Sequence, residues 1–174
     1  MTTKTKSQEV RKLPPLTIEN AHIMWRNFEG AAKKFNAKGL RNFHVRLETP
    51  VAQKLEADGW NVRWHDPKEE GDEAWASIKV AVRFDNYPPR IVLITGKNKK
   101  GTLIDEDTVY ILDTAEIENV DLKLTASPWS VQGKSGYKAY LSKMFVTLSE
   151  SDLESKYMTA MIKNDHYKEV EQED

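Results

Sequence analysis

The sequence predicts an all-β fold: a small antiparallel barrel, closed or partly open, with short connecting helices and a C-terminal helix that leads into an acidic tail. Apolar and polar residues alternate along several short segments, a pattern typical of half-buried strands. Two long alternating arms in residues 117–148 surround a glycine-rich turn, and a phase change in the second arm indicates a β-bulge. Such curvature favours a barrel, although a sandwich fits the pattern nearly as well.

The first elements alternate clearly. Residues 1–13 are polar and basic, and Pro14-Pro15 marks the start of the folded part. Strands are expected at 16–25, 40–48, 60–65, 75–84 and 91–95. In the segment 75–84, Ala76, Ile78, Val80, Val82 and Phe84 point one way and the remaining residues point the other way.

Two short helices are expected as connectors. The first covers 51–57, with Thr49 as its N-cap, Pro50 at its first position and Gly59 as its stop. The second covers 103–112, with Asp105 as its cap and acidic residues in its first turn.

Residues 117–148 are predicted to form a hairpin. Gly133 and Gly136 are expected to supply the positive-φ turn positions, with Lys134 and Ser135 at the tip. The phase change places one extra residue near 142–143. The positions expected to face the core are Val120, Leu122, Leu124, Ala126, Tyr137, Ala139, Leu141, Met144, Val146 and Leu148.

A capping pattern at 149–157 predicts a C-terminal helix. We therefore expect a single domain at 14–157, between a flexible basic arm at 1–13 and a polar acidic tail at 158–174. Residues 150–174 hold eight acidic and three basic residues, net −5, so the preceding 149 residues hold 23 basic and 19 acidic ones, net +4. A mildly basic body with an acidic tail favours a polyanionic partner.

Composition excludes several classes of protein. The 174 residues include no cysteine, which removes disulfides, cysteine-based zinc sites and a cysteine nucleophile. The N-terminus lacks the apolar core of a signal peptide, and no apolar run could span a membrane, so a cytoplasmic location is expected. The four histidines lack metal-site spacing, and no cofactor is expected.

Basic and aromatic residues recur on the predicted outer faces of the strands and in the loops between them. Single-stranded nucleic-acid binders combine cations for the phosphates with rings on which bases stack. The interpretation that such residues only decorate a solvated face or a subunit interface is about equally probable from the residues alone. The candidate contacts are Arg41, His44, Arg46, Arg63, Trp75, Lys79, Arg83, Lys97, Trp129, Lys134, Lys138, Tyr140, Lys143 and Phe145.

The segment from Phe28 to Leu148 resembles the OB-fold single-stranded DNA-binding proteins of tailed bacteriophages. The stretches that carry the resemblance are FNAKGLRNFHVRL, LEADGWNVRW, PPRIVLITGK and ENVDLKLTASPWSVQGKSGYKAYLSKMFVTL. The resemblance implies an OB barrel that binds single-stranded DNA with little sequence preference in replication or recombination, in the host cytoplasm. It also implies an acidic tail that competes with DNA or docks on replication proteins. This tail ends Gln172-Glu173-Asp174, without the terminal aromatic residue that such tails often carry.

Two other functions stay open on the sequence. The first is a β-rich interaction or assembly protein, in which the exposed rings form a subunit interface and a homo-oligomer results. The second, ranked last, is a metal-dependent nuclease that uses Asp105, Glu106, Asp107 and Asp113. A helix N-terminus explains the first three acids without a metal, so the main expectation is a protein without enzymatic activity.

Overall fold

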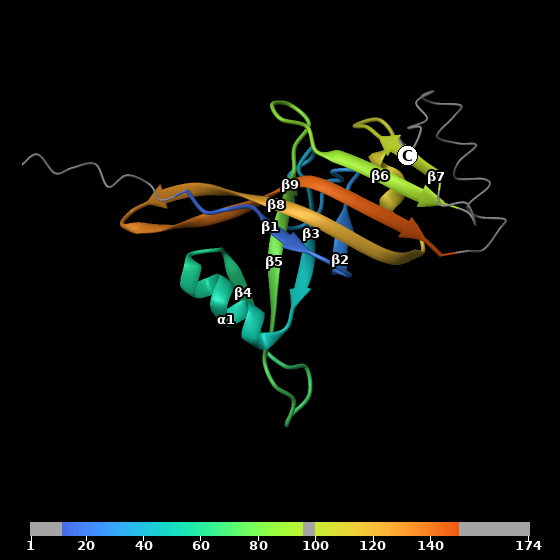
Figure 1. Ribbon diagram of the computed structural model, residues 1–174. Helices are drawn as coiled ribbons and strands as arrows, with labels where there is room; N and C mark the ends of the chain where they lie inside the picture. Colours follow the sequence, from blue (N-terminus) through green and yellow to red (C-terminus); the bar gives the residue numbers. More distant parts are fainter. Residues whose placement is uncertain (1–11, 96–99, 150–174) are drawn as a thin grey trace, which may run out of the picture.

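A computed structural model of the chain describes residues 12–95 and 100–149. These residues form one sheet of nine strands, one α-helix and one short 3₁₀ helix (Figure 1). The strands are β1 (Leu16–Ile18), β2 (His22–Asn27), β3 (Arg41–Leu47), β4 (Val62–His65), β5 (Trp75–Val82), β6 (Arg90–Thr95), β7 (Lys100–Ile104), β8 (Ile117–Val131) and β9 (Lys134–Leu148). The all-β prediction is confirmed, and the predicted C-terminal helix and tail lie outside the described residues.

The sheet follows the order β1-β8-β9-β5-β3-β2, with β4 beside β5 and the β6–β7 pair beside β9. Most pairings are antiparallel, whereas β9 runs parallel to β5 and β6. The two ends of this path, β1 and β2, are consecutive in the chain, and no ladder joins them. The sheet is therefore partly open, and its ends meet at the bend of residues 19–21, where the Ala21 N–H donates to the Val120 carbonyl (2.7 Å). This is an OB-like arrangement.

The β8–β9 hairpin is the longest element, and its tip projects at the left of Figure 1 beyond the other strands. The predicted core-facing positions are confirmed in register, for example Val120 opposite Val146 and Leu122 opposite Met144. Lys123 pairs with Lys143 and Leu124 pairs with Leu141, so Ser142 is the extra residue of the predicted bulge.

The tip of the hairpin was predicted two residues too late, at Lys134 and Ser135, although Gly133 does take the predicted positive φ. Val131 pairs with Lys134, and the turn residues are Gln132 (φ 49°) and Gly133 (φ 78°). Two successive positive φ angles suit the twist of a two-residue hairpin. Gly136 instead lies in β9, where a Cβ atom would stand 2.7 Å from Asn61 Oδ1 and 3.1 Å from Trp129 Nε1. Its small size makes room for the Trp129 ring.

The helix α1 (Thr49–Asp58) confirms the first predicted helix, which ends at Gly59 in the left-handed region (φ 104°). Its N-cap is Glu48 and not Thr49. The second predicted helix is wrong: residues 100–104 form β7, and a 3₁₀ helix, η1 (Val109–Asp113), follows. Asp105 is not the cap of η1, whose N-cap is Thr108; its Oδ1 instead accepts the N–H groups of Asp107 (3.0 Å) and Thr108 (3.2 Å) in the turn before the helix.

The core fills the inner side of the curved sheet. Its largest fully buried side chains come from β3, β5, β6, β8 and β9, together with Phe28 and Leu112. Phe28 and Phe43 stack at 5.1 Å between ring centroids. Burial of one side of β3 and β5 leaves their other side as a broad surface, and the candidate site lies on that surface.

Candidate nucleic-acid interface

Outward side chains of β2, β3, β4, β5 and β9 form one continuous surface. Side chains of directly paired residues point to the same side of a sheet, and His44 pairs with Lys79, Arg63 with Ser77, and Ala81 with Tyr140. We call this surface the outer face, and none of its outward residues on these strands is acidic. Its members are His22, Met24, Asn42, His44, Arg46, Arg63, His65, Trp75, Ser77, Lys79, Ala81, Lys138 and Tyr140.

Trp25 joins the outer face through a bulge in β2. Met24 pairs with His44 and Asn27 pairs with Asn42, so Trp25 and Arg26 together lie opposite Phe43 alone. Trp25 has φ 49°, an uncommon conformation for a bulky residue, and 55% of its surface is exposed. Regular alternation would have turned this ring toward the core with Ile23. Backbone strain that leaves a large ring exposed is typical of functional sites.

Three rings lie around Trp25. The His65 and Trp75 rings are stacked, with centroids 4.1 Å apart and an interplanar angle of 25°. Trp25 meets His44 edge-on at 4.9 Å and Trp75 at 5.6 Å. The Arg46 guanidinium lies 5.0 Å from the Trp75 ring centroid. This aromatic cluster (Trp25, His44, His65 and Trp75) thus offers exposed π surface beside a cation.

The buried Ser77 hydroxyl forms a hydrogen bond with each of the two imidazole rings, His44 and His65. Ser77 Oγ lies 3.0 Å from His44 Nδ1 and 2.8 Å from His65 Nε2. Because a hydroxyl has one proton, Ser77 can donate to one ring and must accept from the other. Burial lowers the pKa of His44 to about 4, with further lowering by the nearby Arg63, Lys79 and His65. A pKa near 4 makes His44 neutral at pH 7, and its ring packs edge-on against Trp25.

Four cations cross the outer face between the rings: Arg46, Arg63, Lys79 and Lys138. Among residues 12–95 and 100–149, none of the four forms an ion pair with a carboxylate. The pKa of Lys79 is lowered by burial and by repulsion from Arg63 and Lys138. Neighbouring like charges without a counter-ion create a positive potential that a bound phosphate chain would relieve.

A groove of about 510 Å³ marks one end of the outer face. Lys138 Nζ lies 5.2 Å from the centroid of the Tyr140 ring on its floor. The two arginines at its rim are each paired with an acid, Arg41 with Glu106 (3.3 Å) and Arg83 with Asp85. The lining residues that matter here are Leu40, Arg41, Asn42, Lys79, Arg83 and Tyr140.

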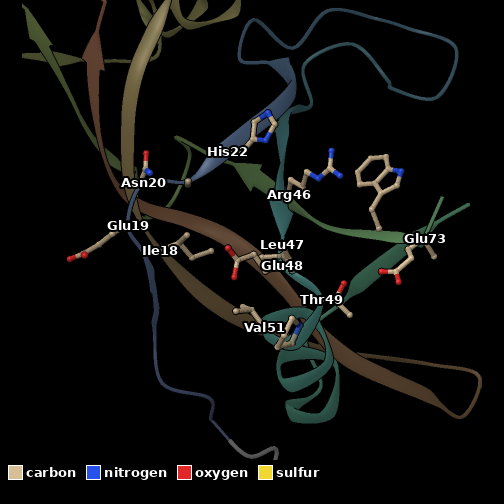
Figure 2. Close-up of a pocket in the computed structure, with 14 residues that line it drawn as sticks. Ile18, Glu19, Asn20, His22, Arg46, Leu47, Glu48, Thr49, Val51 and Glu73 are labelled. Atoms are coloured by element: carbon tan, nitrogen blue, oxygen red, sulfur yellow. The ribbon is translucent and has the colours of Figure 1, made fainter. Parts of the chain in front are cut away.

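A hollow of about 720 Å³ lies at the other end (Figure 2). His22 and Arg46, which pair across β2 and β3, stand at its upper part, and Glu48 and Thr49 lie below them at the start of α1. Trp75 also lines this hollow. The cations and rings of the outer face thus extend between two depressions.

The structure brings together seven of the predicted contacts on the outer face: His44, Arg46, Arg63, Trp75, Lys79, Lys138 and Tyr140. Arg41 and Arg83 lie at the rim of the 510 Å³ groove. Trp129 lies half-buried on the same side of the hairpin, where its indole N–H donates to Asn61 Oδ1 (3.0 Å). Lys134 is exposed at the hairpin tip, and Lys97 lies outside the described residues.

Lys143 and Phe145 lie apart from this group. They line a separate hollow of about 240 Å³ with Thr17, Lys123 and Asp121 on β1 and β8. Their side chains are exposed on β9, beyond the bulge at Ser142. The hairpin therefore divides its predicted contacts between two places.

Sequence reasoning missed Trp25 and left His65 out of the candidates. The alternation in 60–65 already placed His65 outward beside Arg63, so that signal was present. Trp25 gave no such signal, because the bulge that turns it outward breaks the period of two.

Asp113, one of the acids considered for a nuclease, forms hydrogen bonds with the backbone after β2. The Asp113 carboxylate accepts the backbone N–H groups of Phe28 (2.6 Å) and Glu29 (3.0 Å). Within the described part of the chain, no group of three or more His, Asp or Glu side chains could hold a metal ion. The helices formed by the same residues include none with the length and apolar character to cross a membrane.

An OB-like sheet that carries aromatic rings and cations on the outer sides of β3 and β5 has the features of modules that bind single-stranded nucleic acid. The sequence matches, over residues 5–174, a family model described as "Putative phage ssDNA-binding domain". The chain therefore belongs to this family of phage proteins that bind single-stranded DNA.

The fold is similar to that of the single-stranded DNA-binding protein from bacteriophage Enc34, with a TM-score of 0.49. The two chains are 7% identical in sequence, and the match covers 82% of this chain and 89% of that chain. A comparison with curated protein sequences gives no match.

Proposed function

We propose that the outer face is the DNA-binding surface and that the protein covers single-stranded DNA without strong sequence preference during phage replication or recombination. The observation that carries the proposal is the exposed Trp25 ring beside the half-buried Trp75 and Arg46, on strands whose outward residues include no acid. Rings and cations recognise features that every nucleotide has, namely a π face and a phosphate. Such a role is binding and not catalysis.

Each group has a distinct part in this mechanism. Bases would stack on Trp25, Trp75 and Tyr140, at about 1–3 kcal/mol per base. Phosphates would lie along Arg46, Arg63, Lys79 and Lys138. Arg41 and Arg83 would exchange their carboxylate partners for phosphates as the strand enters the 510 Å³ groove.

The remaining candidates would extend the contact along the hairpin. Lys143 and Phe145 lie on the exposed side of β9 beyond Tyr140, and Lys134 is at the tip. Trp129 would hold the hairpin against Asn61 more than it would stack on a base. Lys97, which lies outside the described residues, is retained as a contact on the sequence alone.

Intrinsic fluorescence titration with oligo-dT tests the proposal. Trp25→Ala or Trp75→Ala should weaken binding about 5- to 150-fold, the equivalent of one lost stack. Trp64→Ala is the matched control, because this exposed ring lies on the other side, where its indole donates to Glu56 of α1 (2.8 Å). Equal losses in all three variants would sink the proposal.

The acidic C-terminal segment gives a second test. Residues 150–174 carry a net charge of −5, which suits competition with DNA for the outer face or docking on replication proteins. Deletion of residues 165–174 should tighten oligo-dT binding at low salt. An unchanged affinity would remove the competition from the mechanism.

Gel filtration of the wild type and of the same variants tests for a homo-oligomer. If Trp25 and Trp75 formed a subunit interface, gel filtration would show a complex that dissociates in Trp25→Ala. A variant that loses DNA binding but keeps the elution volume of the wild type supports the DNA-binding role.

A further inference from the structure

The connection between β2 and β3 is long, and backbone hydrogen bonds hold its conformation. It covers residues 28–40, whereas hairpin connections usually have about 2–5 residues. The Gly39 N–H donates to the Gly30 carbonyl (2.8 Å), and Lys33 and Asn36 exchange backbone hydrogen bonds (2.9 and 3.1 Å). Long ordered loops without secondary structure are usually functional.

Asn36 holds this loop together and ties it to the outer face. Its amide nitrogen donates to the carbonyls of Ala31 (3.0 Å), Ala37 (3.2 Å) and Leu40 (3.0 Å). Its Oδ1 accepts from Asn42 Nδ2 (2.8 Å), and Asn42 is an outer-face residue of β3 that lines the 510 Å³ groove. The loop is thus fixed at the mouth of that groove.

Two glycines form the neck of the loop. Gly30 and Gly39 have φ values of 75° and 93°, and a Cβ atom on Gly30 would stand 3.1 Å from the Gly39 carbonyl carbon. The close approach therefore requires a residue without a side chain at position 30, whereas Gly39 is favoured by its positive φ alone.

Phe35 stands at the tip of this loop and packs against no core. It is 90% exposed, in the two-residue turn between Lys33 and Asn36. Lys34 Nζ lies 5.4 Å from the centroid of its ring, and residues 30–40 include Lys33, Lys34 and Lys38 but no acid. An ordered loop with an exposed aromatic ring and three lysines has the chemical groups of a base-stacking site.

We propose that the 28–40 loop is a second DNA contact, at which Phe35 stacks on a base of the strand that leaves the 510 Å³ groove and its lysines bind the adjacent phosphates. The inference rests on the proposed outer-face site, and it extends the bound strand beyond that site. Because the loop is already ordered by Asn36, the contact forms with little loss of conformational freedom.

Oligonucleotide length tests the inference. Phe35→Ala should leave affinity for an oligo-dT of about 4 nucleotides unchanged, because the outer face alone can hold it, and should weaken binding of about 16 nucleotides roughly tenfold. Trp25→Ala should weaken both lengths, since its ring belongs to the outer face. A Phe35→Ala loss of equal size at both lengths, or at neither, would overturn the second contact.

Phe35→Trp supplies an independent readout. The new indole should restore affinity for the long oligonucleotide. Quenching of the total tryptophan emission should exceed that of the wild type with the long oligonucleotide and should show no such excess with the short one. Trp64→Ala, which removes a ring on the α1 side, should bind both lengths as the wild type does. If the wild type fails to bind the long oligonucleotide at low salt, the proposed function itself fails, an outcome distinct from failure of the loop alone.

Discussion

The Asp113 carboxylate accepts hydrogen bonds from the backbone N–H groups of Phe28 (2.6 Å) and Glu29 (3.0 Å), directly after the bulge that turns Trp25 outward. Arg26, within the bulge, donates from Nη1 to the carbonyls of Leu112 and Ala115, both at 2.8 Å. The strained bulge is thus held to the region of η1 at two places: by Arg26 within the bulge, and by the Phe28 and Glu29 N–H groups directly after it. We infer that Asp113 is a positioning residue for the Trp25 ring.

Loss of the Asp113 anchor should weaken DNA binding through Trp25. Asp113→Ala should lower oligo-dT affinity by about 1 kcal/mol and the free energy of unfolding by about 1–3 kcal/mol, because two charge-assisted hydrogen bonds are removed. In a double-mutant cycle with Trp25→Ala, the two effects on affinity should not add.

Asp105→Ala is the matched control for this cycle, since the Asp105 carboxylate accepts two backbone N–H groups in the turn just before η1, from Asp107 and Thr108. It should lower stability and leave affinity unchanged. Additive effects of Asp113→Ala and Trp25→Ala would show that Asp113 supports the fold alone.

The salt dependence of binding should report the cations of the outer face. Lys79→Ala should reduce the slope of log Kd against log salt by about 0.7, the value for one phosphate contact on a single strand. Lys54, an exposed lysine on α1, provides the control Lys54→Ala. Titrations at several salt concentrations measure both slopes, and equal slopes for Lys79→Ala and the wild type would contradict a phosphate contact at this residue.

Stability should fall on acidification because His44 is held neutral. Its pKa is lowered to about 4 in the folded protein, mainly by burial, against about 6.5 in the unfolded chain. Between these values the unfolded state binds more protons, so the stabilisation is present above pH 6.5 and is lost as the pH falls toward 4. The loss should amount to about 2 kcal/mol.

Urea unfolding at pH 7 and pH 4 measures this contribution. His44→Gln should reduce the difference between the two pH values, whereas His22→Gln, at an exposed position of β2, should retain it. A pH dependence that is the same in the wild type and in His44→Gln would show that His44 does not titrate in this window.

Space, and not backbone conformation, should make Gly136 sensitive to substitution. Gly136→Ala would place Cβ 2.7 Å from Asn61 Oδ1, so the Trp129–Asn61 hydrogen bond would be displaced at a cost of about 1–3 kcal/mol. Gly71→Ala meets no atom within 4 Å and costs only the strain of its positive φ, about 1 kcal/mol. Denaturant midpoints should therefore fall further for Gly136→Ala.

Alternation predicted the parts of the fold in which one side of a strand is buried. Val120, Leu122 and Met144 obeyed the period of two, and even the bulge at Ser142 was visible as a phase change. The turn was misplaced because Gln132 takes a positive φ that sequence preference assigns to glycine. The segment 100–104 was misassigned because it pairs with the preceding strand β6, and this pairing overrides local helix preference.

In the candidate site, too, residues on regular strands could be predicted, and a residue that depends on distant contacts could not. Arg46, Arg63 and Lys79 were found because regular strands present them at fixed intervals. Trp25 could not be found, since its exposure depends on a bulge anchored by Asp113, 85 or more residues away from the strand. Contacts of that range leave no trace in local periodicity.

The parallel pairing of β9 with β5 has a consequence for folding kinetics. The β8–β9 ladder joins neighbouring segments and can form early, since hairpins close in about 1–10 μs. Val80 and Ala139 must meet across a much longer stretch of chain before β5 docks on β9. We therefore expect the protein to acquire its affinity for DNA in the last and slowest step of refolding, after most of its secondary structure has formed.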